Sequence, residues 1–230
     1  MKLFDAEKTK KITSLLALRP NFRDQEWFDE FFSTVIGAEF WGISSKVLQT
    51  EDGFPYIALF TDKREDTPEQ LSVADILPIA TENGFGAVIN PHKIQPDWIF
   101  TYGQLWSLRD FGSFVVKEDE IEELNLPDDE DKEGIFVTQP SEELFPHYAR
   151  ISIKRYLLKR YKIANPQVMM LIDPSEKPLS SFVFSIFEED FQSKNDFEQV
   201  LMGIDWHLLP HYGLRALPKE SEIAENFEPF

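Results

Sequence analysis

The feature that most constrains this chain is a strongly acidic segment near its middle, residues 117–134. Ten acidic residues stand there against two lysines, which leaves a net charge of −8 out of −18 for the whole chain of 230 residues. A segment of this kind repels itself and offers few apolar side chains to a core. The sequence therefore predicts two folded domains, residues 1–116 and 135–230, joined by an acidic linker over residues 117–134.

Composition excludes several classes of protein. Hydrophobic residues make up 42% of the chain and charged residues 28%, as in ordinary globular proteins. So acidic a chain repels phosphates and anionic lipids, and we expect neither nucleic acid nor a membrane as its partner. Cysteine is absent, which excludes disulfides and thiolate chemistry. The sequence contains no long apolar segment, and residues 1–11 do not resemble a secretory signal, so we expect a cytoplasmic protein.

Helical and strand patterns alternate irregularly in both halves. The expected helices are one that starts at Asn21 or Asp24 and continues to 35, 72–83, a short one around 105–108, one within 141–162 that Ser141 caps, and one that starts at Ser193 or Asn195 and continues to 208. The expected strands are 38–48, 55–61, 86–90, 98–102, 135–138, 168–173, 181–187 and 213–217. The lack of a regular βα alternation predicts an α+β fold with two small mixed α/β-sheet domains.

Three stretches are similar to one protein family. Pro55-Tyr56-Ile57-Ala58-Leu59-Phe60-Thr61-Asp62 resembles the strand ending in Phe-Thr in the N-terminal domain of SseB-like (enhanced serine sensitivity) proteins. Gly84-Phe85-Gly86-Ala87-Val88-Ile89-Asn90-Pro91 resembles the Gly-x-Gly, apolar strand and Asn-Pro ending of the same domain. Residues 140–230 resemble the C-terminal domain of the family, including the tail Glu228-Pro229-Phe230.

The resemblance implies two small α+β domains and no established catalytic residues. Our leading hypothesis is accordingly a non-enzymatic interaction or regulatory module with a protein partner. The alternative is an acidic immunity-type protein that neutralises a basic toxin, because a high negative charge speeds the capture of a cationic partner. An enzyme of unrecognised type is the third hypothesis.

Motifs that carry chemistry are missing. The chain has no phosphate-binding Gly-Lys-Ser/Thr loop and no Gly-x-Ser-x-Gly nucleophile elbow, so we predict no catalytic residues and no cofactor. His207 and His211 have the spacing of zinc ligands on a helix. Pro210 lies between them and is expected to end the helix at Leu209, which separates the two rings. We therefore predict no metal site, and we expect both imidazoles to be exposed or half-buried.

A first candidate partner site is an aromatic row that consists of Trp98, Tyr102 and Trp106. If residues 98–102 form a strand, the side chains of Trp98, Phe100 and Tyr102 lie on the same face. Such a row is either part of a core or, if two of its rings are exposed together, a binding surface.

A second candidate is the helix near residues 145–162, which carries six basic residues and no acidic one. Helical geometry places four of them in one arc (Lys154, Arg155, Lys159 and Lys162). Ile151 and Leu158 lie in the same arc, whereas the apolar residues expected to face the core lie opposite (Ala149, Ile153, Tyr156 and Leu157). Either the basic side chains cover their own domain, or they bind an anion. That anion would be an acidic partner or the acidic linker, whose short tether favours masking of the helix.

Overall fold

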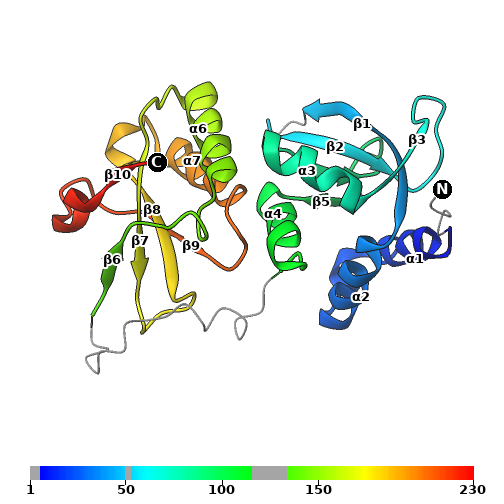
Figure 1. Ribbon diagram of the computed structural model, residues 1–230, viewed down its shortest axis with the longest axis horizontal. Helices are drawn as coiled ribbons and strands as arrows, with labels where there is room; N and C mark the ends of the chain where they lie inside the picture. The colour runs from blue at the N-terminus through cyan, green and yellow to red at the C-terminus, as the bar shows by residue number, and fades with distance from the viewer. Residues whose placement is uncertain (1–5, 50–52, 116–133) are drawn as a thin grey trace. The chain divides into compact units, whose positions relative to one another are not determined.

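The computed structural model describes residues 6–49, 53–115 and 134–230, and the chain divides between Phe114 and Val115 into two compact units (Figure 1). Residues 1–114 form unit 1 and residues 115–230 form unit 2. All of the predicted linker except Gly134 lies outside the described residues. Both units contain a mixed sheet with helices packed on it, which confirms the predicted α+β fold.

Unit 1 is built on a five-stranded sheet with the strand order β3-β1-β2-β4-β5. The neighbours β2 and β4 are parallel and are connected through α3, whereas the other neighbouring strands are antiparallel. Its strands are β1 (Glu39–Gln49), β2 (Pro55–Phe60), β3 (Glu69–Ser72), β4 (Gly86–Ile89) and β5 (Trp98–Phe100). Its helices are α1 (Ala6–Leu16), the 3-10 turn η1 (Pro20–Phe22), α2 (Gln25–Ile36), α3 (Val73–Asn83) and α4 (Tyr102–Phe111).

The core of unit 1 lies between one face of this sheet and its helices. Alternate strand residues, among them Leu59, Ile89 and Phe100, pack with Phe31 of α2 and Ile76 of α3. This pattern follows from the strand periodicity of two, which sends every second side chain to the same face. The aromatic stripe of α2 and the apolar strands are therefore used together in one core.

Local capping explains where the helices of unit 1 begin. The hydroxyl of Ser72 accepts a hydrogen bond from the backbone N–H of Asp75, whose carboxylate accepts one from the N–H of Ser72. Thr101 and Gln104 form the same reciprocal arrangement at the start of α4. Such caps satisfy amide groups that have no partner in the first turn. Gly84 ends α3 with a φ of 75°, which a glycine adopts without strain.

Unit 2 contains a sheet in which β7 is central and pairs with three other strands. The strand order is β10-β7-β8-β9, and β6 also pairs with β7. Two helices, α6 and α7, lie side by side in this unit (Figure 1). The strands are β6 (Phe136–Thr138), β7 (Gln167–Ile172), β8 (Ser180–Phe184), β9 (Gly213–Arg215) and β10 (Glu228–Pro229). The helices are α6 (His147–Tyr161), α7 (Lys194–Asp205) and the 3-10 turns η2 (Glu188–Asp190) and η3 (Glu222–Asn226).

The structure departs from the predicted elements in several places. The helix α1 is not among the expected helices, because its buried apolar residues are only Ile12 and Leu16 and charged residues surround them. The short strands β3 and β10 were not expected either. The predicted strand 98–102 ends at Phe100, because the capping box at Thr101 starts α4 immediately afterwards. Within the residues that the structure describes, no helix has the length and apolar character needed to cross a bilayer.

Candidate functional site

The aromatic row predicted as a partner site is divided between two elements. Trp98 lies in β5, whereas Tyr102 and Trp106 lie in α4, so the three rings do not share a strand face. Trp98 is partly buried, and its ring packs 4.7 Å from that of Phe31, centroid to centroid. This side chain belongs to an aromatic cluster with α2, because Trp27, Phe28 and Phe32 also surround it.

Tyr102 and Trp106 have no exposed surface at all. The hydroxyl of Tyr102 donates a hydrogen bond of 3.0 Å to the backbone carbonyl of Thr81 in α3. The indole N–H of Trp106 donates one of 2.7 Å to the carboxylate of Asp110, one turn further along α4. Buried Tyr and Trp side chains need such partners for their polar atoms. The condition for a binding surface, that two rings are exposed together, is therefore not met by Tyr102 and Trp106, and a partner role of this row stays a prediction.

The second candidate, the basic helix, is α6. Ser141 does not begin it as expected; the helix begins at His147, directly after Pro146, whose fixed φ suits the position before the first helical residue. It ends at Tyr161 and is followed by Lys162, which adopts a left-handed conformation with a φ of 65°. Its buried residues are Ala149, Ser152, Ile153 and Leu157. The spacing of three and four places these residues on one face, as predicted for Ala149, Ile153 and Leu157, whereas Tyr156 is half-buried.

Three of the basic side chains bind groups of their own unit. The guanidinium of Arg150 donates to the carbonyls of Phe145 at 2.6 Å and Pro140 at 2.7 Å. The ammonium group of Lys154 lies over the ring of Phe230, 5.3 Å from its centroid. Lys162 donates to the carbonyl of Lys159 at 3.3 Å. These cations stabilise unit 2. For this part of the helix, the basic side chains therefore cover their own domain, which is the first of the two alternatives.

The outward face of α6 has a different character. Ile151 is 37% exposed and Leu158 is 52% exposed, and the side chains of Arg155 and Lys159 are exposed beside them. We call these four residues the α6 surface. It combines aliphatic and cationic groups, and α6 itself contributes no acidic side chain to it. A surface of this composition is suited to an anionic partner that also carries apolar groups.

The predicted pairing of this helix with the acidic linker concerns residues that lie outside the described ones. That pairing stays a prediction.

His211 is half-buried, as expected, whereas His207 is buried. His207 is only 3% exposed, and its Nδ1 lies 2.7 Å from the carbonyl of Gly203. Burial lowers the pKa of the His207 imidazole to about 4, so the ring is neutral at pH 7. The helix ends earlier than predicted, at Asp205. Among the described residues no three His, Asp or Glu side chains gather as metal ligands would.

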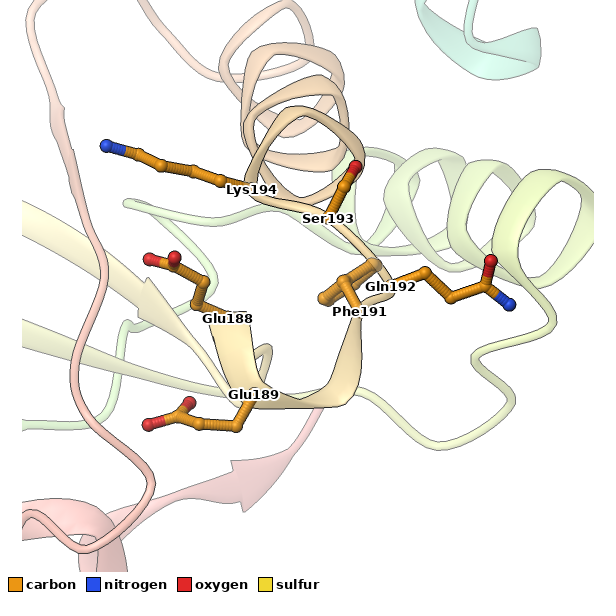
Figure 2. Close-up of a pocket in the computed structure, with 6 residues that line it drawn as sticks. All are labelled: Glu188, Glu189, Phe191, Gln192, Ser193 and Lys194. Atoms are coloured by element: carbon orange, nitrogen blue, oxygen red, sulfur yellow. The ribbon is translucent and has the colours of Figure 1, made fainter.

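A shallow hollow at the start of α7 offers no converging chemistry. It is lined by Glu188, Glu189, Phe191, Gln192, Ser193 and Lys194. Figure 2 shows the polar side chains spreading outward, with Gln192 directed away from Glu188 and Lys194. A second hollow, bordered by Ala58 and Phe60 of β2, has a volume of ≈ 30 Å³, which is too small for an organic ligand.

Sequence reasoning missed a buried polar network at the ends of β2 and β4. Asn90 has a φ of 52°, its side-chain oxygen accepts from the N–H of Thr61 at 3.0 Å, and its amide donates to Asp97 at 2.7 Å. The signal in the sequence was the pair Asn90-Pro91 directly after an apolar strand. Because the side-chain oxygen and nitrogen of Asn90 are both engaged within unit 1, this network is structural.

No family model, curated protein or solved structure matches this chain. The resemblance to SseB-like proteins therefore stays a prediction, and the functional argument rests on the site itself.

Proposed function

We propose that this protein is a non-enzymatic, cytoplasmic interaction or regulatory module that binds an acidic protein partner through the α6 surface. One observation carries the proposal: Ile151 and Leu158 are exposed beside Arg155 and Lys159 on the side of α6 opposite to its buried face. The absence of cysteine fits a reducing compartment.

The charges support an acidic partner. The chain carries a net charge of −18, so a local cationic surface is unusual for it. Complementary charge increases the rate of association and selects against wrong partners, although each exposed ion pair contributes only about 0–1 kcal/mol. An anion without apolar groups would therefore bind weakly and be displaced by salt.

The exposed aliphatic side chains support a protein instead of a small anion. Interfaces owe much of their affinity to a few apolar side chains that become buried in the complex. Isolated apolar residues are common on protein surfaces, but here two of them lie on one line beside cations. A phosphate or a nucleotide would leave Ile151 and Leu158 in water, whereas a protein segment would cover them.

The experiment measures fluorescence anisotropy of a labelled acidic peptide of about 20 residues, made of Glu, Ala and Leu and long enough for several helical turns. The full chain is expected to bind it at an ionic strength of about 20 mM and to lose affinity by about 200 mM. The counterpart with Lys in place of Glu is expected to bind much more weakly. Stronger binding of the Lys peptide would overturn the proposal and favour the acidic immunity-type alternative. Tighter binding of a DNA duplex would also overturn it.

A matched pair of variants separates the α6 surface from net charge. Arg155→Glu with Lys159→Glu reverses two charges on the surface, and we expect binding of the acidic peptide to be lost. Lys10→Glu with Lys194→Glu makes the same change in net charge at exposed positions of α1 and α7. The second variant is expected to bind as the unchanged protein does. Equal losses in the two variants would show that only the total charge matters.

A further inference from the structure

We propose that the α6 surface binds an acidic amphipathic helix whose apolar residues recur every seven positions. This inference rests on the proposed function and specifies the shape of the partner. It follows from the placement of Ile151 and Leu158 and of the cations around them.

The two exposed aliphatic residues lie on one line along the helix. They are seven positions apart, which is about 10.5 Å along the axis with an angular offset of only about 20°. A repeat of seven is the spacing that keeps apolar residues of two paired helices in register. The line lies on the side of α6 opposite to Ile153 and Leu157, both of which are fully buried.

The cations lie along one side of this line, where charged residues border the apolar seam of a helix pair. Arg155 lies between Ile151 and Leu158 in sequence and about 50° to one side of the line in helical projection, and Lys159 lies further round on the same side. Lys162 follows beyond the last helical turn and is also exposed. In paired helices the residues next to the seam form interhelical ion pairs that select the partner. A partner helix for this surface therefore presents Glu or Asp beside its own apolar line.

An extended partner fits the spacing less well. Side chains on one face of a strand are separated by about 6.7 Å, or about 13 Å at the next repeat, and neither value matches about 10.5 Å. A helix with apolar residues seven positions apart matches it directly. The surface is therefore expected to discriminate between acidic sequences by the spacing of their apolar residues, which charge attraction alone does not do.

The test uses three peptides of identical charge, each rich in Glu and Ala. In the first, the Leu residues are seven positions apart; in the second, the same residues are moved to opposite helix faces; in the third, each Leu is replaced by Gln. We expect the first to bind the full chain at least about tenfold more tightly than the other two, which corresponds to about 1.4 kcal/mol. Circular dichroism of the free and mixed samples should show helix gained by the first peptide on binding.

Ile151→Gln with Leu158→Gln is expected to abolish the preference for the first peptide while keeping weak binding of all three. Gln is a good helix former, and both positions are exposed, so the helix itself should persist. Met202→Gln, at a 52% exposed position of α7, is the matched control and should keep the preference. If all three acidic peptides bind equally to the unchanged protein, the helical partner is wrong and the proposed function stands. If no acidic peptide binds, the helical partner and the proposed function both fail.

Discussion

The aromatic row of unit 1 and the α6 surface of unit 2 were both candidate partner sites, and their environments are opposite. Tyr102 and Trp106 have no exposed surface, although large aromatic side chains are common in binding sites. Ile151 and Leu158 are smaller and less conspicuous in the sequence, yet they are exposed. The difference shows that the kind of side chain is a poorer guide to a binding site than the face on which it lies.

The two regions differ in what surrounds the apolar residues along the chain. Trp98 and Phe100 are followed by a capping box and a further helix, so neighbouring elements cover them. In α6 the buried face has its own apolar residues, among them Ile153 and Leu157, and this face makes the contact with the rest of the unit. Ile151 and Leu158 lie on the remaining face, beside cations. A helix with apolar residues on two opposite faces cannot bury both against one sheet.

The largest expected effect tests whether the aromatic region is core. Phe100→Ala removes a fully buried ring that stacks 4.7 Å from that of Phe114, and it should cost about 3–5 kcal/mol of the free energy of unfolding. Hydrogen exchange measured by mass spectrometry should show lost protection in residues 86–100, with residues 167–184 unchanged. A loss below about 1 kcal/mol would mean that the aromatic region is not a packed core.

The next prediction concerns the buried side of α6, where the ring of His207 lies 5.1 Å from that of Tyr156. Burial lowers the pKa of His207 to about 4 from an ordinary value of 6.5. Between these values the unfolded chain binds a proton that the folded chain does not, so the free energy of unfolding falls as pH decreases from 6.5 toward 4. The expected slope is on the order of 1 kcal/mol per pH unit.

His207→Gln should reduce that dependence, as measured by urea denaturation at a series of pH values, and the remainder comes from His211, whose pKa burial also lowers to about 4. Binding of the acidic peptide at the α6 surface should not change between about pH 5.5 and 8, because His207 lies on the buried side of α6 and not on that surface. A parallel change of binding and stability with pH in that range would contradict the separation of the two faces of α6.

A smaller effect is expected from closing the space between α6 and α7. A Cβ atom added at Gly203 would lie 1.6 Å from the hydroxyl oxygen of Tyr156 and 2.1 Å from its ring carbon, so the tyrosine must move. Gly203→Ala should cost about 1–3 kcal/mol of the free energy of unfolding, as overpacked core positions do. Gly112→Ala is a useful comparison, since a Cβ there meets no atom within 4 Å and any loss comes from its φ of 73°. Equal costs at the two positions would show that contact with Tyr156 is not the cause.

Much of the fold could be predicted because its signals are local. Ser72 with Asp75 and Gly84 bound α3 as expected, and the apolar run 55–61 contains β2. Other elements depend on partners far away in the chain. The strand β10 consists of Glu228 and Pro229 and exists only because β7 offers an edge for it. In α1 the signal is weak, since charged residues surround Ile12 and Leu16.

The candidate site was only partly predictable for a related reason. Helical projection places Ile151 and Leu158 opposite the residues that face the core, and the structure agrees. It could not show that Lys154 lies over Phe230, because that contact joins residues 76 positions apart in sequence. Nor could it show that Tyr102 begins a helix, because the spacing of Trp98, Phe100 and Tyr102 also fits a strand. Periodicity assigns a face, and tertiary contacts decide which faces are covered.

The smallest expected effect tests most directly whether the outward face of α6 is free of packing within this chain while the opposite face is buried. Ile151→Gln with Leu158→Gln should change the free energy of unfolding by no more than about 0.5 kcal/mol, because exposed positions lose little contact on substitution. Ile153→Ala with Leu157→Ala, on the buried face of the same helix, should cost several kcal/mol, since each removes a fully buried side chain at about 2–5 kcal/mol. Urea denaturation of the two double variants measures both values under one condition. If the exposed double variant loses as much free energy of unfolding as the buried one, Ile151 and Leu158 are already packed within this chain. The α6 surface would then have no apolar groups to offer a partner, and the acidic helix proposed for it would lose its main source of specificity.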